Sequence, residues 1–445
     1  MRPFGLIASV VIAGAACAPG SATPTPASSA PTSVAAASAT ASTAPTEGLR
    51  DRPVASTPGP ARRWYTIPDG LFHDEVPLNV QFPGVDATVG RPRARLAASG
   101  RTVDLAPSPG AASQWVGVLP LDGNTAAGEH TVEYLVRLRD GSDAVVATAT
   151  FMVSAPEYVV WTLDFEGDAA GDAEMANTAA IADALGVPMT LMWNPRVWTT
   201  TQVSASRADA MFAWTKLRAS KGDEIALHLH MWNDFVRAAG LVPRTTPSWA
   251  GRGDGYDVPI TAYNEGETRT LVEYSLRLLA EHGLPKPTSF RGGGLFANAA
   301  NLRAVAALGF TADCSATSAG PFGQLQLPWT LASDAQPYYP ARDDANTAGD
   351  LTLLEAPTIA GNTYGHSVSS IAAVAQADLR KIAAPGQPAA QRRALTIVSH
   401  PGTIDTIERA AIEALFHAFD PYRYDRDSGP LRFVTLAQLA KAYGR

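Results

Sequence analysis

From residue 157 to residue 445, short apolar segments alternate with helical patterns, and this alternation constrains the fold more than any other feature. Alternating strands and helices predict a parallel sheet or barrel with helices packed outside it. In such folds the reactive side chains lie at the carboxyl ends of the strands. The predicted strands are residues 158–165, 187–193, 224–232, 287–293, 351–357 and 394–401, and the predicted helices are residues 175–185, 268–283, 299–310, 408–419 and 433–444.

Ionisable side chains follow most of these strand ends. They are Asp164, Glu166, His228, His230, Arg291 and His400. In an extended strand, residues i and i+2 share a face, so Asp164 should lie beside Glu166, and His228 beside His230. Two imidazoles and one carboxylate suit Zn²⁺ or another divalent transition ion, and the second carboxylate can then serve as a base toward a bound water. A cation would also offset the repulsion among the carboxylates of residues 161–168.

Four segments, in this order, resemble the motifs of the polysaccharide deacetylase family (the NodB-type carbohydrate esterases). They are TLDFEGD (162–168), EIALHLHMW (224–232), SFRGGG (289–294) and LTIVSHP (395–401). The resemblance extends over roughly residues 157–445 and includes the closing phrase FVTLAQLA (433–440). It implies a distorted (β/α) barrel of about seven strands over residues 156–445. It also implies metal-dependent removal of N- or O-acetyl groups from a polysaccharide.

The resemblance further implies a role for each matching residue. Asp164 falls on the family's base, Arg291 on the arginine that orients this base, and His400 on the general acid, although the sequence reads Ser-His-Pro where Leu-x-His is usual. Phe165 and Trp232 stand where the family usually has two metal ligands. The implied roles at the remaining positions are metal ligation by Glu166, His228 and His230, and substrate binding or orientation by Asp313 and Trp232.

The first 60 residues have the composition of an export signal and a linker. Arg2 precedes an apolar run that ends just before Cys17, which resembles a bacterial lipoprotein signal over residues 1–17 and implies lipidation of Cys17. Cleavage as an ordinary secreted protein is the alternative. Residues 18–60 are mainly Ala, Ser, Thr and Pro, which predicts a disordered tether. We therefore expect a cell-envelope lipoprotein or a secreted protein, attached to the membrane only through a lipid.

Residues 61–155 have the alternation of an all-β domain. Apolar residues alternate on both sides of the Asp140-Gly141 turn within residues 130–153, which predicts a hairpin. Phrases in this region resemble immunoglobulin-like modules, so we expect a small β-sandwich. A spacer is the favoured role, and glycan or partner binding is the alternative.

The expected function is hydrolysis of acetyl groups on an extracytoplasmic polysaccharide, with Zn²⁺, Co²⁺, Ni²⁺ or Mn²⁺ as the metal. The net charge of −7 and the lack of a dense Lys/Arg run argue against a nucleic-acid partner. Two alternatives stay open: an inactive glycan-binding protein of the cell surface with the same fold, and an amidohydrolase acting on a small non-sugar C–N bond. Joint retention of Asp164, Arg291 and His400 favours an enzyme. The polymer, the acetyl linkage and the oligomeric state are left open.

Overall fold

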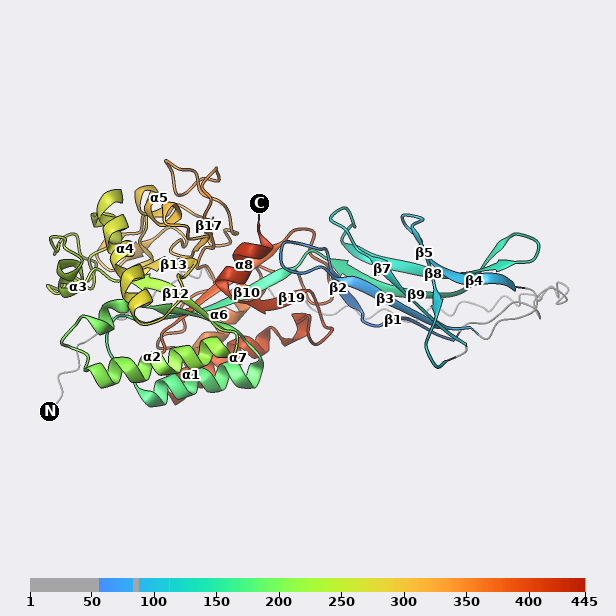
Figure 1. Ribbon diagram of the computed structural model, residues 1–445, viewed down its shortest axis with the longest axis horizontal. Helices are drawn as coiled ribbons and strands as arrows, with labels where there is room; N and C mark the ends of the chain where they lie inside the picture. Colours follow the sequence, from blue (N-terminus) through green and yellow to red (C-terminus); the bar gives the residue numbers. More distant parts are fainter. Residues whose placement is uncertain (1–55, 83–87, 112, 445) are drawn as a thin grey trace, which may run out of the picture.

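The computed structural model describes residues 56–82, 88–111 and 113–444, which form two parts arranged end to end (Figure 1). Strands alone make up the first part, within the described residues up to 154, and the second part alternates strands and helices. The predicted signal, Cys17 and most of the predicted tether lie outside the described residues. None of the helices in the described ranges has the length and apolar character needed to cross a membrane.

Two sheets enclose one apolar core in the N-terminal part. The four-stranded sheet has the order β1 (Ser56–Pro60), β3 (Glu75–Gln81), β7 (Gln114–Pro120), β6 (Ala106–Pro107), and the five-stranded sheet has the order β2 (Trp64–Thr66), β9 (Asp143–Ser154), β8 (Gly128–Leu138), β4 (Thr88–Leu96), β5 (Thr102–Asp104). Alternate residues of β3, namely Val76, Leu78 and Val80, are buried in this core together with Tyr134 of β8 and Phe151 of β9. Strands β8 and β9 pair in antiparallel fashion around the Asp140-Gly141 turn. The immunoglobulin-like assignment stays a prediction.

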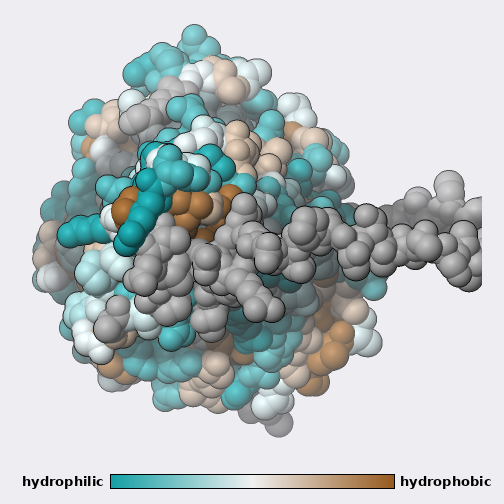
Figure 2. All heavy atoms as spheres, turned by 90° about the vertical axis from the view of Figure 1, so that its right-hand side faces the viewer, coloured by the Kyte–Doolittle hydropathy of each residue, from teal (hydrophilic) through white to brown (hydrophobic). Residues whose placement is uncertain are grey.

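The surface of this end of the molecule is mainly hydrophilic, with a small group of hydrophobic residues near the centre of the view (Figure 2). Among the described residues of the N-terminal part, the large hydrophobic side chains that are exposed are Val89, Val118 and Val145. They lie on three different strands, β4, β7 and β9. The spacer role of this part likewise stays a prediction.

A curled parallel sheet forms the centre of the C-terminal part. Its path of seven strands has the order β17 (Leu354–Glu355), β14 (Ala312–Asp313), β13 (Ser289–Gly292), β12 (Glu224–Leu229), β11 (Met189–Trp193), β10 (Glu157–Asp164), β18 (Arg393–Ser399), and β19 (Leu431–Val434) also pairs with β10. All of these pairs are parallel. An isolated parallel bridge joins Asn362, in the loop after β17, to Val398 of β18. The predicted α/β class with a curled parallel sheet is confirmed.

Helices lie along both sides of this sheet (Figure 1). They are α1 (Asp172–Leu185), α2 (Ala205–Ser220), α3 (Asn233–Ala238), α4 (Glu265–Glu281), α5 (Ala299–Ala307), α6 (Val368–Leu379) and α7 (Thr406–Ala418), and α8 (Leu436–Ala442) closes the chain. Trp161 and Leu163 of β10 belong to the core shared with the outer helices. Tyr158 and Val160 belong to the inner core, together with residues of α8. Because strand residues alternate between faces, Asp164 points to the inner side of the sheet.

Polar contacts join the two parts of the molecule. Arg432 of β19 forms an ion pair with Asp74, with 2.8 Å between Nη2 and Oδ1, and its guanidinium lies 4.1 Å from the centre of the Phe72 ring. The hydroxyl of Tyr158 is hydrogen-bonded to Asp69. Because β9 ends at residue 154 and β10 begins at residue 157, the N-terminal part leads almost directly into the strand that carries Asp164.

Candidate metal and catalytic site

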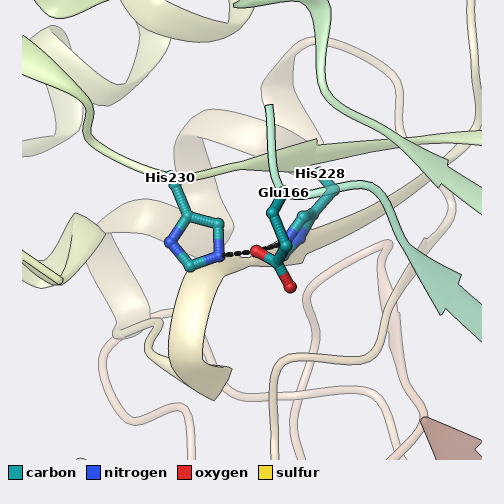
Figure 3. Close-up of side chains that lie close together, drawn as sticks. All are labelled: Glu166, His228 and His230. Atoms are coloured by element: carbon teal, nitrogen blue, oxygen red, sulfur yellow. Dashed lines mark ion pairs between the residues drawn. The ribbon is translucent and has the colours of Figure 1, made fainter. Parts of the chain in front are cut away.

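Three predicted metal ligands meet at the carboxyl ends of β10 and β12. His228 lies within β12, His230 follows that strand, and Glu166 lies two residues beyond β10. Figure 3 shows the carboxylate of Glu166 between the two imidazole rings. Glu166 Oε2 is 2.5 Å from His230 Nε2 and 3.5 Å from His228 Nε2. One ligand atom from each residue lies within 4.8 Å of the others, which is compact enough for one ion.

The other nitrogen of each imidazole is held by a backbone carbonyl. His228 Nδ1 lies 3.1 Å from the carbonyl oxygen of Arg291, and His230 Nδ1 lies 2.7 Å from that of Tyr256. Because a carbonyl only accepts, each Nδ1 carries the donated proton, so that in the neutral imidazole each Nε2 would present a lone pair to the common centre. This is the arrangement of metal-bound histidines.

The carboxylate of Glu166 and the two imidazoles form a buried group whose polar atoms face one another. Apart from these ion pairs, His228 Nε2 and Glu166 Oε2 have no hydrogen-bond partner among the described residues. Burial acts to raise the pKa of Glu166, but the charge of His230 and hydrogen bonds from His228, His230 and His400 lower this pKa well below its usual range. The same pairing raises the pKa of His230 against the effect of its burial, so a proton and a cation compete for its Nε2. A carboxylate with two imidazole lone pairs fits a divalent transition ion.

Asp164 is fixed beside this centre by a buried arginine. Arg291 Nη1 donates to Asp164 Oδ1 at 2.7 Å, and Arg291 is fully buried. The same guanidinium donates to Thr162 Oγ1, Thr358 Oγ1 and the carbonyl oxygen of Cys314. The other oxygen of Asp164, Oδ2, faces His228 Nε2 at 3.9 Å. One carboxylate oxygen is therefore held in place, and the other is directed at the centre.

His400 completes the group from the end of β18. Its Nε2 lies 3.1 Å from Glu166 Oε1, the carboxylate oxygen that faces away from His230. Asp164, Glu166 and His400 also lie within 4.8 Å of one another. Asp164 is paired with Arg291, however, so the unpaired negative charge near the imidazoles comes from Glu166 and from Asp168, whose pKa is raised by desolvation and by the charge of Glu166.

Asp313 is buried near Arg291 and acts on it through its charge, while its orienting role stays a prediction. In the described residues no hydrogen bond or ion pair joins it to Arg291. Its oxygens instead accept from the hydroxyl and the backbone N–H of Ser315, at 2.9 and 2.8 Å. The Ser315 hydroxyl oxygen in turn accepts the N–H of Gly292, next to Arg291, at 2.9 Å. Asp313 thus supports the backbone of the arginine segment through Ser315, and it acts on the guanidinium only through its charge.

The two departures from the family pattern have clear positions. Phe165 is buried in the outer core, with its ring centre 5.0 Å from that of Trp193. Trp232 is buried beneath the site, where its Nε1 donates to the carbonyl oxygen of Glu166 at 2.9 Å. Trp232 therefore orients the segment that carries Glu166, and neither side chain replaces a metal ligand.

Sequence reasoning missed the part played by Tyr256. Its ring stacks on the imidazole of His230, with 4.1 Å between centres and 3° between planes, and its carbonyl oxygen fixes the His230 tautomer. Trp249 of the same loop is buried and stacks on Phe296 at 5.4 Å. These aromatic residues thus pack against the site and the loop itself. A backbone carbonyl leaves no signal in the sequence.

Comparison with known proteins gives weak structural similarities. No family model and no curated protein matches the sequence. A protein from Mycobacterium smegmatis assigned as a polysaccharide deacetylase is 14% identical, with a TM-score of 0.41, over 64% of this chain and 89% of that chain. A family 4 carbohydrate esterase from Streptomyces lividans is 12% identical, with a TM-score of 0.32, over 62% and 97%. A family 4 acetyl xylan esterase from Clostridium thermocellum, in complex with a cobalt ion, is 13% identical, with a TM-score of 0.31, over 63% and 89%.

Proposed function

We propose that this protein is a metal-dependent hydrolase that removes acetyl groups from an extracytoplasmic polysaccharide. The observation that carries the proposal is the convergence, at one edge of the sheet, of a carboxylate, two imidazoles and a second carboxylate held by a buried arginine. A purely structural site does not require such a cluster, because the burial of several ionisable groups together costs free energy.

Each residue has a distinct task in this reaction. Glu166, His228 and His230 would hold a divalent transition ion, which would supply a Lewis acid and lower the pKa of a water molecule. Arg291 holds Asp164 by Oδ1, so that Oδ2 accepts the proton of the attacking water. His400 then donates a proton to the leaving nitrogen or oxygen as its bond to the acetyl carbon breaks. Acetate and the deacetylated sugar are the products.

The choice of a polysaccharide rests on the export signal expected from residues 1–17. An exported enzyme meets envelope and extracellular polymers, whereas small cytoplasmic metabolites are out of its reach. This disfavours an amidohydrolase acting on small molecules. The inactive binding protein is disfavoured by the buried Asp164–Arg291 pair and the adjacent His400, which a binding surface does not require.

Metal content and acetate release test the proposal together. Protein produced without residues 1–17 should hold about one transition metal ion per chain by elemental analysis. The Glu166→Ala, His228→Ala double variant should lose it, whereas His417→Ala, a control at an exposed histidine on α7, should keep it. Wild type should release acetate from acetylated xylan or from an N-acetylated chito-oligosaccharide, and His400→Ala should not. Absence of both metal and acetate release after incubation with Zn²⁺ or Co²⁺ would favour the binding protein.

A further inference from the structure

A buried carboxylate lies behind His400 and takes no part in the reaction described above. Glu408, in the first turn of α7, is 4% exposed. Its Oε1 accepts from the hydroxyl of Thr363 at 2.9 Å, and its Oε2 from the hydroxyl of Thr403 at 3.0 Å. Burial raises the pKa of Glu408, whereas these two hydrogen bonds and the nearby His400 lower it. A carboxylate this deep is costly unless its hydrogen bonds compensate, so both hydroxyls are held firmly to it.

A chain of hydrogen bonds runs from Trp161 of β10 to Glu408 Oε1. Trp161 Nε1 donates to Ser399 Oγ at 2.8 Å, and Ser399 Oγ lies 2.7 Å from Thr363 Oγ1. An indole N–H only donates and an ionised carboxylate only accepts. Thr363 must therefore donate to Glu408, and Ser399 must donate to Thr363. The charge on Glu408 thus sets the direction of every bond in the chain, including those of Ser399, the residue just before His400.

The second oxygen of Glu408 holds the turn on the other side of His400. The hydroxyl of Thr403 lies 3.0 Å from Glu408 Oε2 and also 3.0 Å from the carbonyl oxygen of His400. The backbone N–H of Thr403 donates to the same carbonyl at 2.9 Å. The residue before His400 and the turn after it are therefore both tied to one carboxylate.

We propose that Glu408 is the positioning residue for His400, and that it holds the imidazole in place for proton transfer to the leaving group. This inference rests on the proposed function, because the position of the His400 imidazole matters only if His400 donates a proton in the reaction. An amide in place of the carboxylate presents a single acceptor oxygen, so it cannot receive both threonine hydroxyls in the same way. Either the Ser399 side or the Thr403 side of His400 is then released. A small displacement of a general acid is enough to lower the rate strongly.

The test compares leaving groups in wild type and Glu408→Gln. Departure of 4-nitrophenolate from 4-nitrophenyl acetate needs no general acid, whereas departure of a sugar amine or alkoxide from an N-acetylated chito-oligosaccharide or acetylated xylan does. We expect Glu408→Gln to lower kcat on the carbohydrate by about 10- to 100-fold. KM, metal content and kcat on the aryl ester should change by no more than about threefold, because the attack on the acetyl carbonyl does not involve His400.

A second pair of variants covers the case in which Glu408→Gln does not fold. Thr403→Val removes the hydroxyl at nearly constant volume and should lower kcat on the carbohydrate selectively, whereas Thr403→Ser keeps the hydroxyl and should restore it. Equal losses on both probes, or no loss on either, would overturn the role of Glu408. Wild type inactive on every probe is a separate result, because it would overturn the proposed function first and the role of Glu408 with it.

Discussion

Replacement of Arg291 by methionine tests how the candidate base is held. The guanidinium is fully buried and donates to Asp164 Oδ1 at 2.7 Å, so Arg291→Met leaves a buried carboxylate without its cation. Removal of one partner of a buried ion pair costs about 3–5 kcal/mol. The other groups released lose little, since Thr358 Oγ1 already donates to the carbonyl oxygen of Cys314 at 2.9 Å. We therefore expect the free energy of unfolding to fall by about 4 kcal/mol.

Urea-induced unfolding of a double-mutant cycle measures this value. Asp164→Asn, Arg291→Met and the double variant should be strongly non-additive, with a coupling of at least about 2 kcal/mol, because the double variant buries no lone charge. Arg291→Lys serves as the conservative control, since an ammonium keeps the charge but not the planar set of donors. It should fold with its metal and have a lower kcat. Additive losses, or a loss below about 1 kcal/mol for Arg291→Met, would show that Asp164 does not depend on Arg291.

Two further variants test the support of the site and of the strand that carries it. Trp232→Phe removes the donor to the Glu166 carbonyl but keeps an aromatic ring, so metal affinity measured by competition with a chelator should fall about tenfold; unchanged affinity would argue against an orienting role. Burial raises the pKa of Glu157, at the start of β10, from 4.5 to about 7. The folded state therefore favours the neutral form of Glu157. The contribution of this group to the free energy of unfolding is complete below about pH 4.5 and is lost as the pH rises to about 7. The loss amounts to about 3 kcal/mol, and in urea unfolding Glu157→Gln should remove this slope, whereas equal slopes in both proteins would refute the assignment.

The spatial convergence of the candidate residues could be predicted from the sequence because the rules involved are local. Strand ends can be recognised from apolar runs, and the carboxyl ends of parallel strands meet at one edge of a sheet. This is why Asp164, His228, Arg291 and His400, which are far apart in the chain, could be expected together. Glu408 could not be expected there, because its partners Thr363 and Thr403 are brought to it by the packing of the loop after β17 and the turn after β18.

Element boundaries were predicted less well, for reasons of packing. The helix predicted over residues 433–444 begins instead as β19, because Val434 pairs with Val160 of β10, and the helix α8 starts only at Leu436. The strand predicted over residues 351–357 is reduced to Leu354–Glu355 at the edge of the sheet. Helix α2, over Ala205–Ser220, was not predicted at all. Its buried residues include Thr215 and Arg218, whose polar groups weaken the apolar pattern on its inner face.

The departures at positions 165 and 232 are linked by geometry. A carboxylate at position 165 would lie among aromatic rings of the outer core, because Phe165 points to the face opposite Asp164. A carboxylate that faces the site can therefore come from position 166, beyond the last paired residue of β10, where the ladder no longer fixes the backbone. Trp232 supplies a restraint there, since its indole N–H donates to the carbonyl oxygen of Glu166. The imidazole that faces Glu166 comes instead from His230, at the end of β12. The tryptophan at position 232 is thus in direct contact with the segment that carries the carboxylate displaced from position 165.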